Sequence, residues 1–206
     1  MMNLLMRMFV WILVHIVYRV RVRGVVENLP RTGACVVVCN HVSFVDALIL
    51  LSAVKRPIRF VMDHHIFKMP LLGLIFRIAK AIPIASKRDD EALMEKAFRD
   101  VEAALTHGDV VGIFPEGKIT RTGDINQFRP GIERLIATSP VPVVPLALRG
   151  LWGSFFSRVD GHAMRHPFRR GVWSRVELVG GELVPAAEVS AKMLEDKVRT
   201  LRGDVP

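Results

Sequence analysis

Two short runs of the sequence hold side chains that could perform acid–base chemistry, and the first is NHVSFVD at residues 40–46. It follows the apolar run ACVVVC at residues 34–39 and contains His41 and, five residues later, Asp46. An imidazole titrates near neutral pH and can take a proton from an alcohol, while a neighbouring carboxylate orients it and stabilises its charged form. The two side chains can meet if His41 lies on a turn after a strand and Asp46 in the first turn of a helix.

The same run also permits a purely structural interpretation. Ser43 followed three residues later by Asp46 resembles a capping box, with Ser43 capping a helix and Asp46 in its first turn. This alternative explains Ser43 and Asp46 but leaves His41 without a role.

The second run is FPEGK at residues 114–118, which again follows an apolar, strand-like segment. Pro115 would end the strand and Gly117 would permit a tight turn, so Glu116 is expected at a strand's carboxyl end. A carboxylate there can accept hydrogen bonds from the hydroxyls of a polyol, although a solvated glutamate in an ordinary turn is the alternative. A third run, VPVVP at residues 141–145, reads as a strand with a proline at each end and carries no chemistry by itself.

Hydrophobic periodicity predicts the elements that would position these runs. Strands are expected at residues 19–26, 34–39, 58–62, 109–114, 141–148 and 174–180, and helices at 47–53, 91–105, 131–137 and 188–201. The alternation of strands and helices predicts an α/β fold with a single mixed, largely parallel sheet flanked by helices. In such sheets ligands bind at the carboxyl ends of the strands, where both runs would lie.

Composition limits the class of protein. The chain has 206 residues, half of them apolar and 24% charged, which suits one globular domain and excludes a disordered chain. Its two cysteines, Cys35 and Cys39, are too few for a disulfide framework and lack the partners of a zinc site. A net charge of +9 indicates an anionic partner, either nucleic acid or an acidic membrane surface.

The N-terminal segment favours the membrane. Residues 4–18 are apolar apart from Arg7 and His15, a run shorter than the roughly 20 residues that span a bilayer. The run lacks the cleavage site of a signal peptide, and arginines follow it at positions 19, 21 and 23. We predict a helix in the membrane interface, with Trp11 and Tyr18 near the headgroups and the arginines on lipid phosphates. A core helix that covers the domain is the alternative.

Taken together, the three runs resemble the motifs of the glycerolipid acyltransferases, the family that includes the lysophosphatidic acid acyltransferases. His41 to Asp46 looks like its HxxxxD motif, FPEG at 114–117 matches its second motif, and VPVVP resembles its late V-P-x-x-P strand. The stretch at residues 150–158 further resembles bacterial acyltransferase domains that act on 2-acylglycerophosphoethanolamine and related lysolipids.

This resemblance implies a mechanism. His41 would remove the proton from the free glycerol hydroxyl of a lysophospholipid, Asp46 would orient His41, and the alkoxide would attack the thioester of acyl-CoA or acyl-carrier protein. Neither a cofactor nor a metal is implied. The substrate-binding residues expected from the motifs are Asn40, Ser43, Phe114, Pro115, Glu116, Gly117, Lys118 and Arg121.

The chain departs from the family pattern where phosphate-binding arginines are expected. Family members that use lysophosphatidic acid typically read FPEGTRS, and here Ile119 occupies the arginine position. The middle motif, which resembles G-x-I-F-I-x-R, ends here in Ser86, although Lys87, Arg88 and Arg121 lie nearby. We therefore expect a phosphodiester acceptor such as lysophosphatidylethanolamine, which carries one negative charge on its phosphate rather than two.

The N-terminal segment and the resemblance together imply the organisation of the protein. Residues 1–18 would form an amphipathic membrane-anchoring helix and residues 19–206 the glycerolipid acyltransferase domain. The expected location is the cytoplasmic side of the inner membrane, as a peripheral or monotopic protein. Its partners would be the lysophospholipid, the acyl thioester donor (acyl-CoA or acyl-carrier protein) and an anionic membrane surface, with no nucleic acid.

Several alternatives remain at this stage. The positive charge alone also fits a nucleic-acid-binding module or a membrane-binding protein without catalysis, and Cys39 with His41 could form a thioester hydrolase. His64 and His65 are expected in a surface loop. A basic cluster could bind phosphate or face the membrane; it comprises Arg158, His162, Arg165, His166, Arg169, Arg170 and Arg175. Three aromatic residues could line an acyl groove, enter lipid or pack under a loop; they are Trp152, Phe155 and Phe156.

Overall fold

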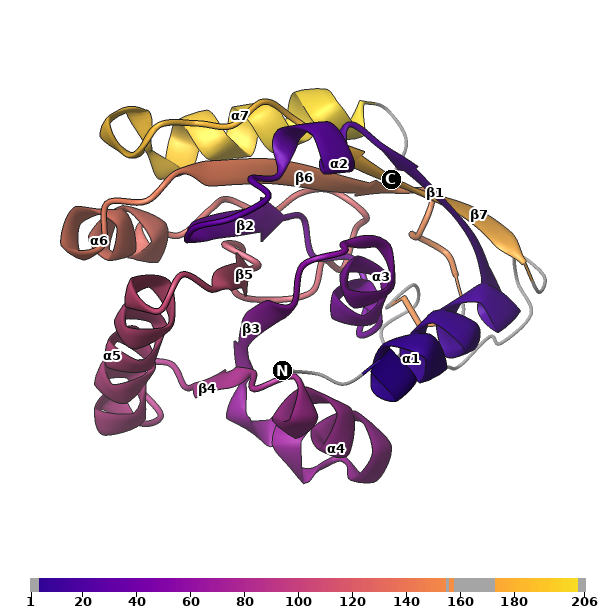
Figure 1. Ribbon diagram of the computed structural model, residues 1–206, viewed down its shortest axis with the longest axis horizontal. Coiled ribbons are helices and arrows are strands. Elements are labelled where there is room, and N and C mark those ends of the chain that lie inside the picture. Colours follow the sequence, from indigo (N-terminus) through magenta and orange to yellow (C-terminus); the bar gives the residue numbers. More distant parts are fainter. Residues whose placement is uncertain (1–3, 155, 158–172, 204–206) are drawn as a thin grey trace.

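One seven-stranded sheet forms the centre of the computed structural model, which describes residues 4–154, 156–157 and 173–203 (Figure 1). The strands are β1 (Tyr18–Arg23), β2 (Cys35–Cys39), β3 (Ile58–Asp63), β4 (Ile82–Ile84), β5 (Val110–Ile113), β6 (Val143–Arg149) and β7 (Ser174–Gly180). The helices are α1 (Leu4–Val17), α2 (Val25–Asn28), α3 (Asp46–Ala53), α4 (Pro70–Ile78), α5 (Glu91–Thr106), α6 (Gly131–Thr138) and α7 (Ala191–Arg202). Two 3₁₀ turns are η1 (His64–Lys68) and η2 (Ala186–Glu188).

The order of the strands confirms the expected mixed, largely parallel sheet. It runs β1-β7-β6-β2-β5-β3-β4, and the five strands from β6 to β4 are mutually parallel. β7 pairs antiparallel with β6 and parallel with the edge strand β1. Since β2 and β5 are neighbours, the residues that follow them emerge side by side at one edge of the sheet.

Both faces of the sheet are covered, as the continuous apolar sequence of β2 predicts. Val37 belongs to a cluster that includes side chains of α1, α3 and α4. Val36 and Val38 point to the other face, into a cluster that includes side chains of α5, α6 and α7. Figure 1 shows these two groups of helices on either side of the central strands.

The first helix has a buried side and an exposed apolar side. Val10 and Val14 lie in the core, α1 packs against α3, and the Arg7 guanidinium bonds the carbonyls of Val54 and Lys55 at the end of α3. The remaining side exposes Leu5, Met8, Phe9, Trp11, Ile12 and Ile16. None of the helices in the described part of the chain has the length and hydropathy that a membrane crossing requires.

Tyr18 does not lie where the sequence analysis expected it. Its side chain is only 2% exposed, and its hydroxyl donates a hydrogen bond of 3.2 Å to Ser154 Oγ. Burial raises the pKa of this phenol to about 12. Tyr18 is thus a core residue at the start of β1 and not a headgroup contact.

β1 ends earlier than predicted because of a close backbone approach. The strand stops at Arg23, and Gly24 takes a positive φ of 67° before the short helix α2. A Cβ at Gly24 would lie 2.6 Å from the carbonyl oxygen of Gly180. Residues 24–26 therefore turn away from the sheet instead of continuing the strand.

Pro145 lies inside β6 and not at its end. It pairs in register with Val38, and its carbonyl accepts a hydrogen bond from Gly181 N on the side of β7. The N and O atoms of one residue point to the same side of a strand, so the missing N–H also faces β7. The paired residues of β6 and β7 begin one residue later, at Leu146. The missing N–H of Pro145 therefore removes no hydrogen bond between these paired residues.

Two elements between β3 and α5 were not anticipated. α4 begins with Pro70 at its first position, where a missing N–H has no cost, and it buries Ile75 and Phe76. β4 has three residues and forms the edge of the sheet beside β3.

At the other end of the chain α7 begins at Ala191, after η2, rather than at residue 188.

Candidate active site

His41 and Asp46 meet at the carboxyl end of β2, a contact that their spacing permits when a turn and the start of a helix follow the strand. Asp46 is the first residue of α3, and its Oδ2 lies 2.7 Å from His41 Nδ1. The same oxygen accepts hydrogen bonds from the backbone N–H groups of Val42 at 2.7 Å and Ser43 at 3.0 Å. The Asp46 side chain is fully buried, whereas that of His41 is 21% exposed. Nδ1–H thus donates to the carboxylate, which leaves the lone pair of Nε2 as the proton acceptor.

Ser43 N donates to Asp46 Oδ2, which is one of the two contacts of a capping box, but Ser43 does not cap α3. Val45 precedes α3 as the cap residue, and no side chain caps the helix. The Asp46 carboxylate instead bonds the loop that precedes it. Ser43 Oγ accepts a hydrogen bond from Val45 N at 3.3 Å, and Ser43 forms an isolated bridge with Ser157.

The backbone of His41 is held by the turn that follows β5. Glu116 Oε1 accepts a hydrogen bond of 2.6 Å from His41 N, and Thr120 N donates one of 2.9 Å to His41 O. Glu116 Oε2 accepts from both the backbone N and Nδ2 of Asn126, each at 2.7 Å. Burial raises the pKa of the Glu116 carboxyl, while these N–H donors act in the opposite direction. Both carboxylate oxygens accept hydrogen bonds from the chain, and Glu116 is buried and does not line the cavity that His41 lines. Glu116 thus holds the backbone of His41, and its contact with a substrate hydroxyl stays a prediction.

Aromatic stacking fixes the plane of the imidazole. The His41 ring lies parallel to that of Phe114, with 4.3 Å between the centroids, and Phe114 in turn stacks on Phe60 of β3. Gly112 of β5 makes room for this stack, since a Cβ there would lie 2.5 Å from the Phe60 ring. Strands β2, β3 and β5 together place the base.

His41 lines a cavity of about 660 Å³. Polar groups of Ser86, Asp89, Lys118 and Arg129 contribute to its wall. Apolar side chains of α5, β5 and α6 form another part; they include Ala97, Phe98, Val101, Ile113, Ile132 and Leu135.

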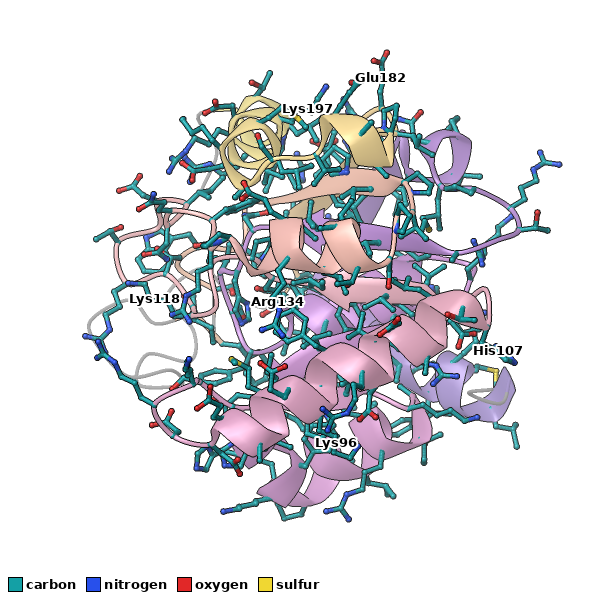
Figure 2. The ribbon with its side chains drawn as sticks, turned by 90° about the vertical axis from the view of Figure 1, so that its left-hand side faces the viewer. Lys96, His107, Lys118, Arg134, Glu182 and Lys197 are labelled. Carbon is teal, nitrogen blue, oxygen red and sulfur yellow. The ribbon has the colours of Figure 1, made fainter. Side chains whose placement is uncertain are left out.

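An ion pair joins the two helices that form the apolar part of the cavity. Arg134 of α6 bonds both carboxylate oxygens of Glu95 of α5, at 3.0 and 2.7 Å, and its guanidinium lies 4.2 Å from the Phe98 ring centroid. Figure 2 shows Arg134 between these two helices. The pair is exposed, so its contribution to stability is small, but it connects α5 to α6 beside the cavity.

The structure separates the expected substrate-binding residues into two groups. Phe114, Pro115, Gly117 and Lys118 line the same cavity as His41. Arg121 was expected to bind the substrate, but it is exposed and does not line this cavity.

Asn40 also has a role other than the expected one. Its Oδ1 accepts a hydrogen bond from Leu148 N at 2.7 Å, and its Nδ2 donates to Leu148 O at 3.0 Å. The buried amide thereby connects the end of β2 to β6, and neither Asn40 nor Ser43 reaches the cavity.

Two neighbours of the site lie outside every motif recognised in the sequence, namely Asn126 and Arg129. The Arg129 guanidinium lies against Gly117, where a Cβ would be 2.7 Å from its Cζ atom, and Gly117 has a φ of 63°. The glycine in FPEG was recognised as a turn residue, but a turn glycine does not reveal which side chain packs on it. Asn126 lies ten residues from Glu116, outside any recognised motif.

The loop that carries these residues is attached to α7. Glu195 Oε2 accepts a hydrogen bond of 2.9 Å from Phe128 N, and Glu195 Oε1 pairs with Arg199 at 3.0 Å. Arg199 also donates to Ile125 O at 2.5 Å, and Arg202 donates to Gly123 O at 2.8 Å. The last described helix therefore holds residues 123–128 in place.

Cys39 is unsuited to the nucleophile of a thioester hydrolase. It is completely buried in β2 and does not line the cavity. Burial raises the pKa of its thiol well above the usual range, so the reactive thiolate is suppressed.

The other candidate groups have structural partners. Asp63 caps η1 by accepting a hydrogen bond from His65 N, and its Oδ1 lies 2.8 Å from His65 Nδ1. Among the described residues, Asp63, His64 and His65 are the one group of potential metal ligands close together. Trp152 packs against Gly123, and both Trp152 and Phe156 contact the core. Phe155 and the cluster residues of 158–172 lie outside the described part of the chain.

Comparisons with known proteins identify the family. Residues 19–149 match the family model described as Acyltransferase, and the chain belongs to this family. It is 32% identical over 134 residues to the chloroplastic 1-acyl-sn-glycerol-3-phosphate acyltransferases of Brassica napus and Arabidopsis thaliana. Each match covers 65% of this chain but only 38% and 36%, respectively, of the plant proteins. The crystal structure of PlsC from Thermotoga maritima, a 1-acyl-sn-glycerophosphate acyltransferase, has a similar fold, with a TM-score of 0.69, 23% identity and coverage of 89% of this chain and 70% of PlsC.

The family match gives a common explanation for the three motifs. The interpretation as a nucleic-acid-binding module leaves His41, Asp46 and the FPEG turn without a role. The resemblance to glycerolipid acyltransferases is therefore confirmed at the level of the family and of the fold.

The buried carboxylate of Glu116 leads to a prediction about stability. In a Glu116→Gln variant an amide NH₂ faces an N–H donor of His41 or Asn126, and the free energy of unfolding at neutral pH should fall by about 1–3 kcal/mol. Because the pKa of Glu116 is raised above 4.5, the folded wild type binds this proton to a higher pH than the unfolded chain. The free energy of unfolding of the wild type should therefore decrease as the pH rises from 4.5 through the raised pKa of Glu116. The variant has no carboxyl at this position and should not show this decrease.

Urea unfolding between pH 4 and 8 measures both effects. Glu182→Gln serves as the control, since Glu182 is exposed on the surface near α7 (Figure 2). Identical pH dependence of the wild type and the Glu116→Gln variant would contradict the assignment.

Burial of the Cys39 thiol leads to a second prediction. A Cys39→Ala variant should retain acyl transfer, because the thiol neither reaches the cavity nor ionises near neutral pH. The wild-type thiol should react with iodoacetamide only after unfolding in urea, as followed by mass spectrometry. Loss of activity in a folded Cys39→Ala protein would restore the hydrolase interpretation.

Proposed function

We propose that this protein transfers an acyl group from a thioester, acyl-CoA or acyl-carrier protein, to the free glycerol hydroxyl of a lysophospholipid. The observation that carries the proposal is an imidazole in the wall of a cavity with its Nδ1 bonded to a buried carboxylate, 2.7 Å from Asp46 Oδ2. This arrangement is that of a general base and the acid that orients it. Membership of the acyltransferase family supports the reaction class.

In the proposed reaction the hydroxyl gives its proton to His41 Nε2 as its oxygen attacks the thioester carbonyl. The C–O bond forms and the carbonyl becomes a tetrahedral oxyanion. Collapse of this intermediate breaks the C–S bond, and the departing thiolate takes the proton from the imidazolium. Asp46 stabilises the imidazolium between the two steps, and no covalent intermediate forms on the protein.

The apolar part of the cavity suits a fatty acyl chain. The side chains from α5, β5 and α6 that line it offer no charge and little polarity. Burying each CH₂ of a chain among them contributes about 0.8 kcal/mol. The acyl group is proposed to lie there, with its thioester carbonyl next to His41.

For the acceptor, two observations point in different directions. The plant relatives are named as 1-acyl-sn-glycerol-3-phosphate acyltransferases, which favours a phosphomonoester. In this chain Ile119, which is buried and lines the cavity, occupies the arginine position of the FPEGTRS motif. Ser86, which also lines the cavity, occupies the arginine position of the middle motif. We propose that a phosphodiester such as lysophosphatidylethanolamine is preferred over 1-acylglycerol-3-phosphate.

The exposed side of α1 is proposed to lie on an anionic membrane, at the cytoplasmic face of the inner membrane. Six large apolar side chains are exposed there, and Arg19 and Arg21 follow on β1. The Arg19 guanidinium lies 4.9 Å from the ring centroid of the exposed Trp173, which adds an aromatic side chain to the surface beside the end of α1. A protein on the surface lets the chain of the lysolipid stay in the bilayer while the headgroup enters the cavity.

Substituting the proposed base and its orienting acid tests the mechanism. His41→Ala should lower kcat by about 10²–10⁴-fold, the contribution of a positioned general base. Asp46→Asn should also lower kcat, because its amide can present an N–H to Nδ1 in place of an acceptor oxygen. Acyl transfer is measured with radiolabelled acyl-CoA, and circular dichroism verifies that both variants are folded. Activity of His41→Ala within a factor of about three of the wild type would overturn the proposal.

A double variant of α1 tests the membrane contact. Ile12→Asp with Ile16→Asp removes two exposed apolar groups, each contributing about 1.5–3 kcal/mol on burial in lipid. Binding to anionic vesicles and turnover on vesicles should fall at least tenfold, while turnover of detergent-solubilised lysolipid should be unchanged. Leu183→Asp, at an exposed apolar position away from α1, is the control. Equal losses on vesicles and in detergent would contradict the membrane role.

A further inference from the structure

The cavity contains an arginine that no motif identifies. Among the described residues that line it, the side chains with a permanent positive charge are those of Lys118 and Arg129. Lys118 is exposed at the edge of the molecule (Figure 2). Arg129 is also exposed, but unlike Lys118 its guanidinium packs against the backbone of Gly117 in the FPEG turn.

The turn that holds His41 also holds Arg129. Arg129 N donates a hydrogen bond of 2.9 Å to Pro115 O, one residue before the Glu116 that bonds His41 N. The neighbouring Phe128 N is bonded to Glu195 of α7. The backbone N–H groups of Arg129 and His41 are therefore bonded to two consecutive residues of a single turn, Pro115 and Glu116.

The guanidinium of Arg129 has no carboxylate partner among the described residues. Two arginines close to it in sequence or in space are paired, Arg134 with Glu95 and Arg199 with Glu195. An unpaired guanidinium in a cavity wall presents planar N–H donors that match two oxygens of a phosphate. A lysine at this position would offer only a point charge.

The covalent structure of the acceptor agrees with this placement. In a lysophospholipid only two or three carbon atoms separate the free hydroxyl from the phosphate, so the base and the phosphate ligand must lie on neighbouring parts of the site. His41 and Arg129 line the same cavity and are tied to Glu116 and Pro115, respectively. The size of the headgroup beyond the phosphate does not affect this requirement.

We infer that Arg129 binds the phosphate of the acceptor and determines the preference for phosphorylated acceptors. The inference rests on the proposed acyl transfer and deepens it. The phosphate of a phosphomonoester and that of a phosphodiester present the same pair of oxygens, and Arg129 serves both. Specificity between the two then depends on charge elsewhere in the cavity and not on Arg129.

The kinetic test compares three acceptors in detergent: lysophosphatidylethanolamine, lysophosphatidate and monoacylglycerol, which lacks the phosphate. Arg129→Ala should raise KM for both phospholipid acceptors by about 10- to 100-fold, with little change in kcat. KM for monoacylglycerol should not change. Arg129→Lys should be intermediate, because it retains the charge without the paired donors. Arg99→Ala removes an exposed arginine of α5 outside the cavity wall and should behave as the wild type.

Direct binding supplies a readout that needs no turnover. In the inactive His41→Ala background, Arg129→Ala should raise the dissociation constant of micellar lysophosphatidylethanolamine and lysophosphatidate by about 10- to 100-fold, and Arg99→Ala should not. An unchanged KM and dissociation constant in Arg129→Ala would overturn the inference, as would an equal loss with monoacylglycerol. Absence of acyl transfer to any lysolipid by the wild type would instead refute the proposed function, and phosphate binding by Arg129 would then be judged by the dissociation constants alone.

Discussion

Two buried carboxylates hold His41, one by its imidazole and one by its backbone, and the rest of the site depends on this arrangement. Asp46 bonds the His41 side chain and the N–H groups of the next two residues, while Glu116 bonds the His41 backbone. Removing a carboxylate from water is costly unless N–H donors replace the lost hydration. Each of these two carboxylates accepts three hydrogen bonds from the chain. Their burial thus fixes both the ring and the loop that carries it.

The order of the strands makes this arrangement possible. HxxxxD and FPEG are separated by about 70 residues in sequence, yet β2 and β5 are neighbours, so both motifs start from the same edge of the sheet. β3 lies on the other side of β5 and contributes Phe60 to the aromatic stack on His41. A side chain at Gly112 would displace Phe60, so a position in the middle of a strand influences the plane of the base.

Local sequence signals were sufficient for the central strands and for α5, and the combination of three separate motifs favoured the contact of His41 with Asp46. They failed where the outcome depended on partners distant in sequence. Pro145 is tolerated within β6 because β7 pairs only from the next residue, which no local pattern reveals. The sequence left the carboxylate of Glu116 in a turn exposed to solvent or facing a substrate, and only the structure shows it buried against Asn126 and His41. The role of Arg129 depends likewise on a packing contact with Gly117.

The attachment of residues 123–128 to α7 has a consequence for where the functional unit ends. The family-matched segment stops at residue 149, but the acceptor for Phe128 N is Glu195, and Arg199 and Arg202 supply donors to the carbonyls of Ile125 and Gly123. A chain truncated after residue 149 would leave these peptide groups without hydrogen-bond partners. It would also release the loop that contains Asn126 and leads to Arg129. The smallest unit that keeps this site intact therefore extends through α7, well past residue 149, where the family match ends.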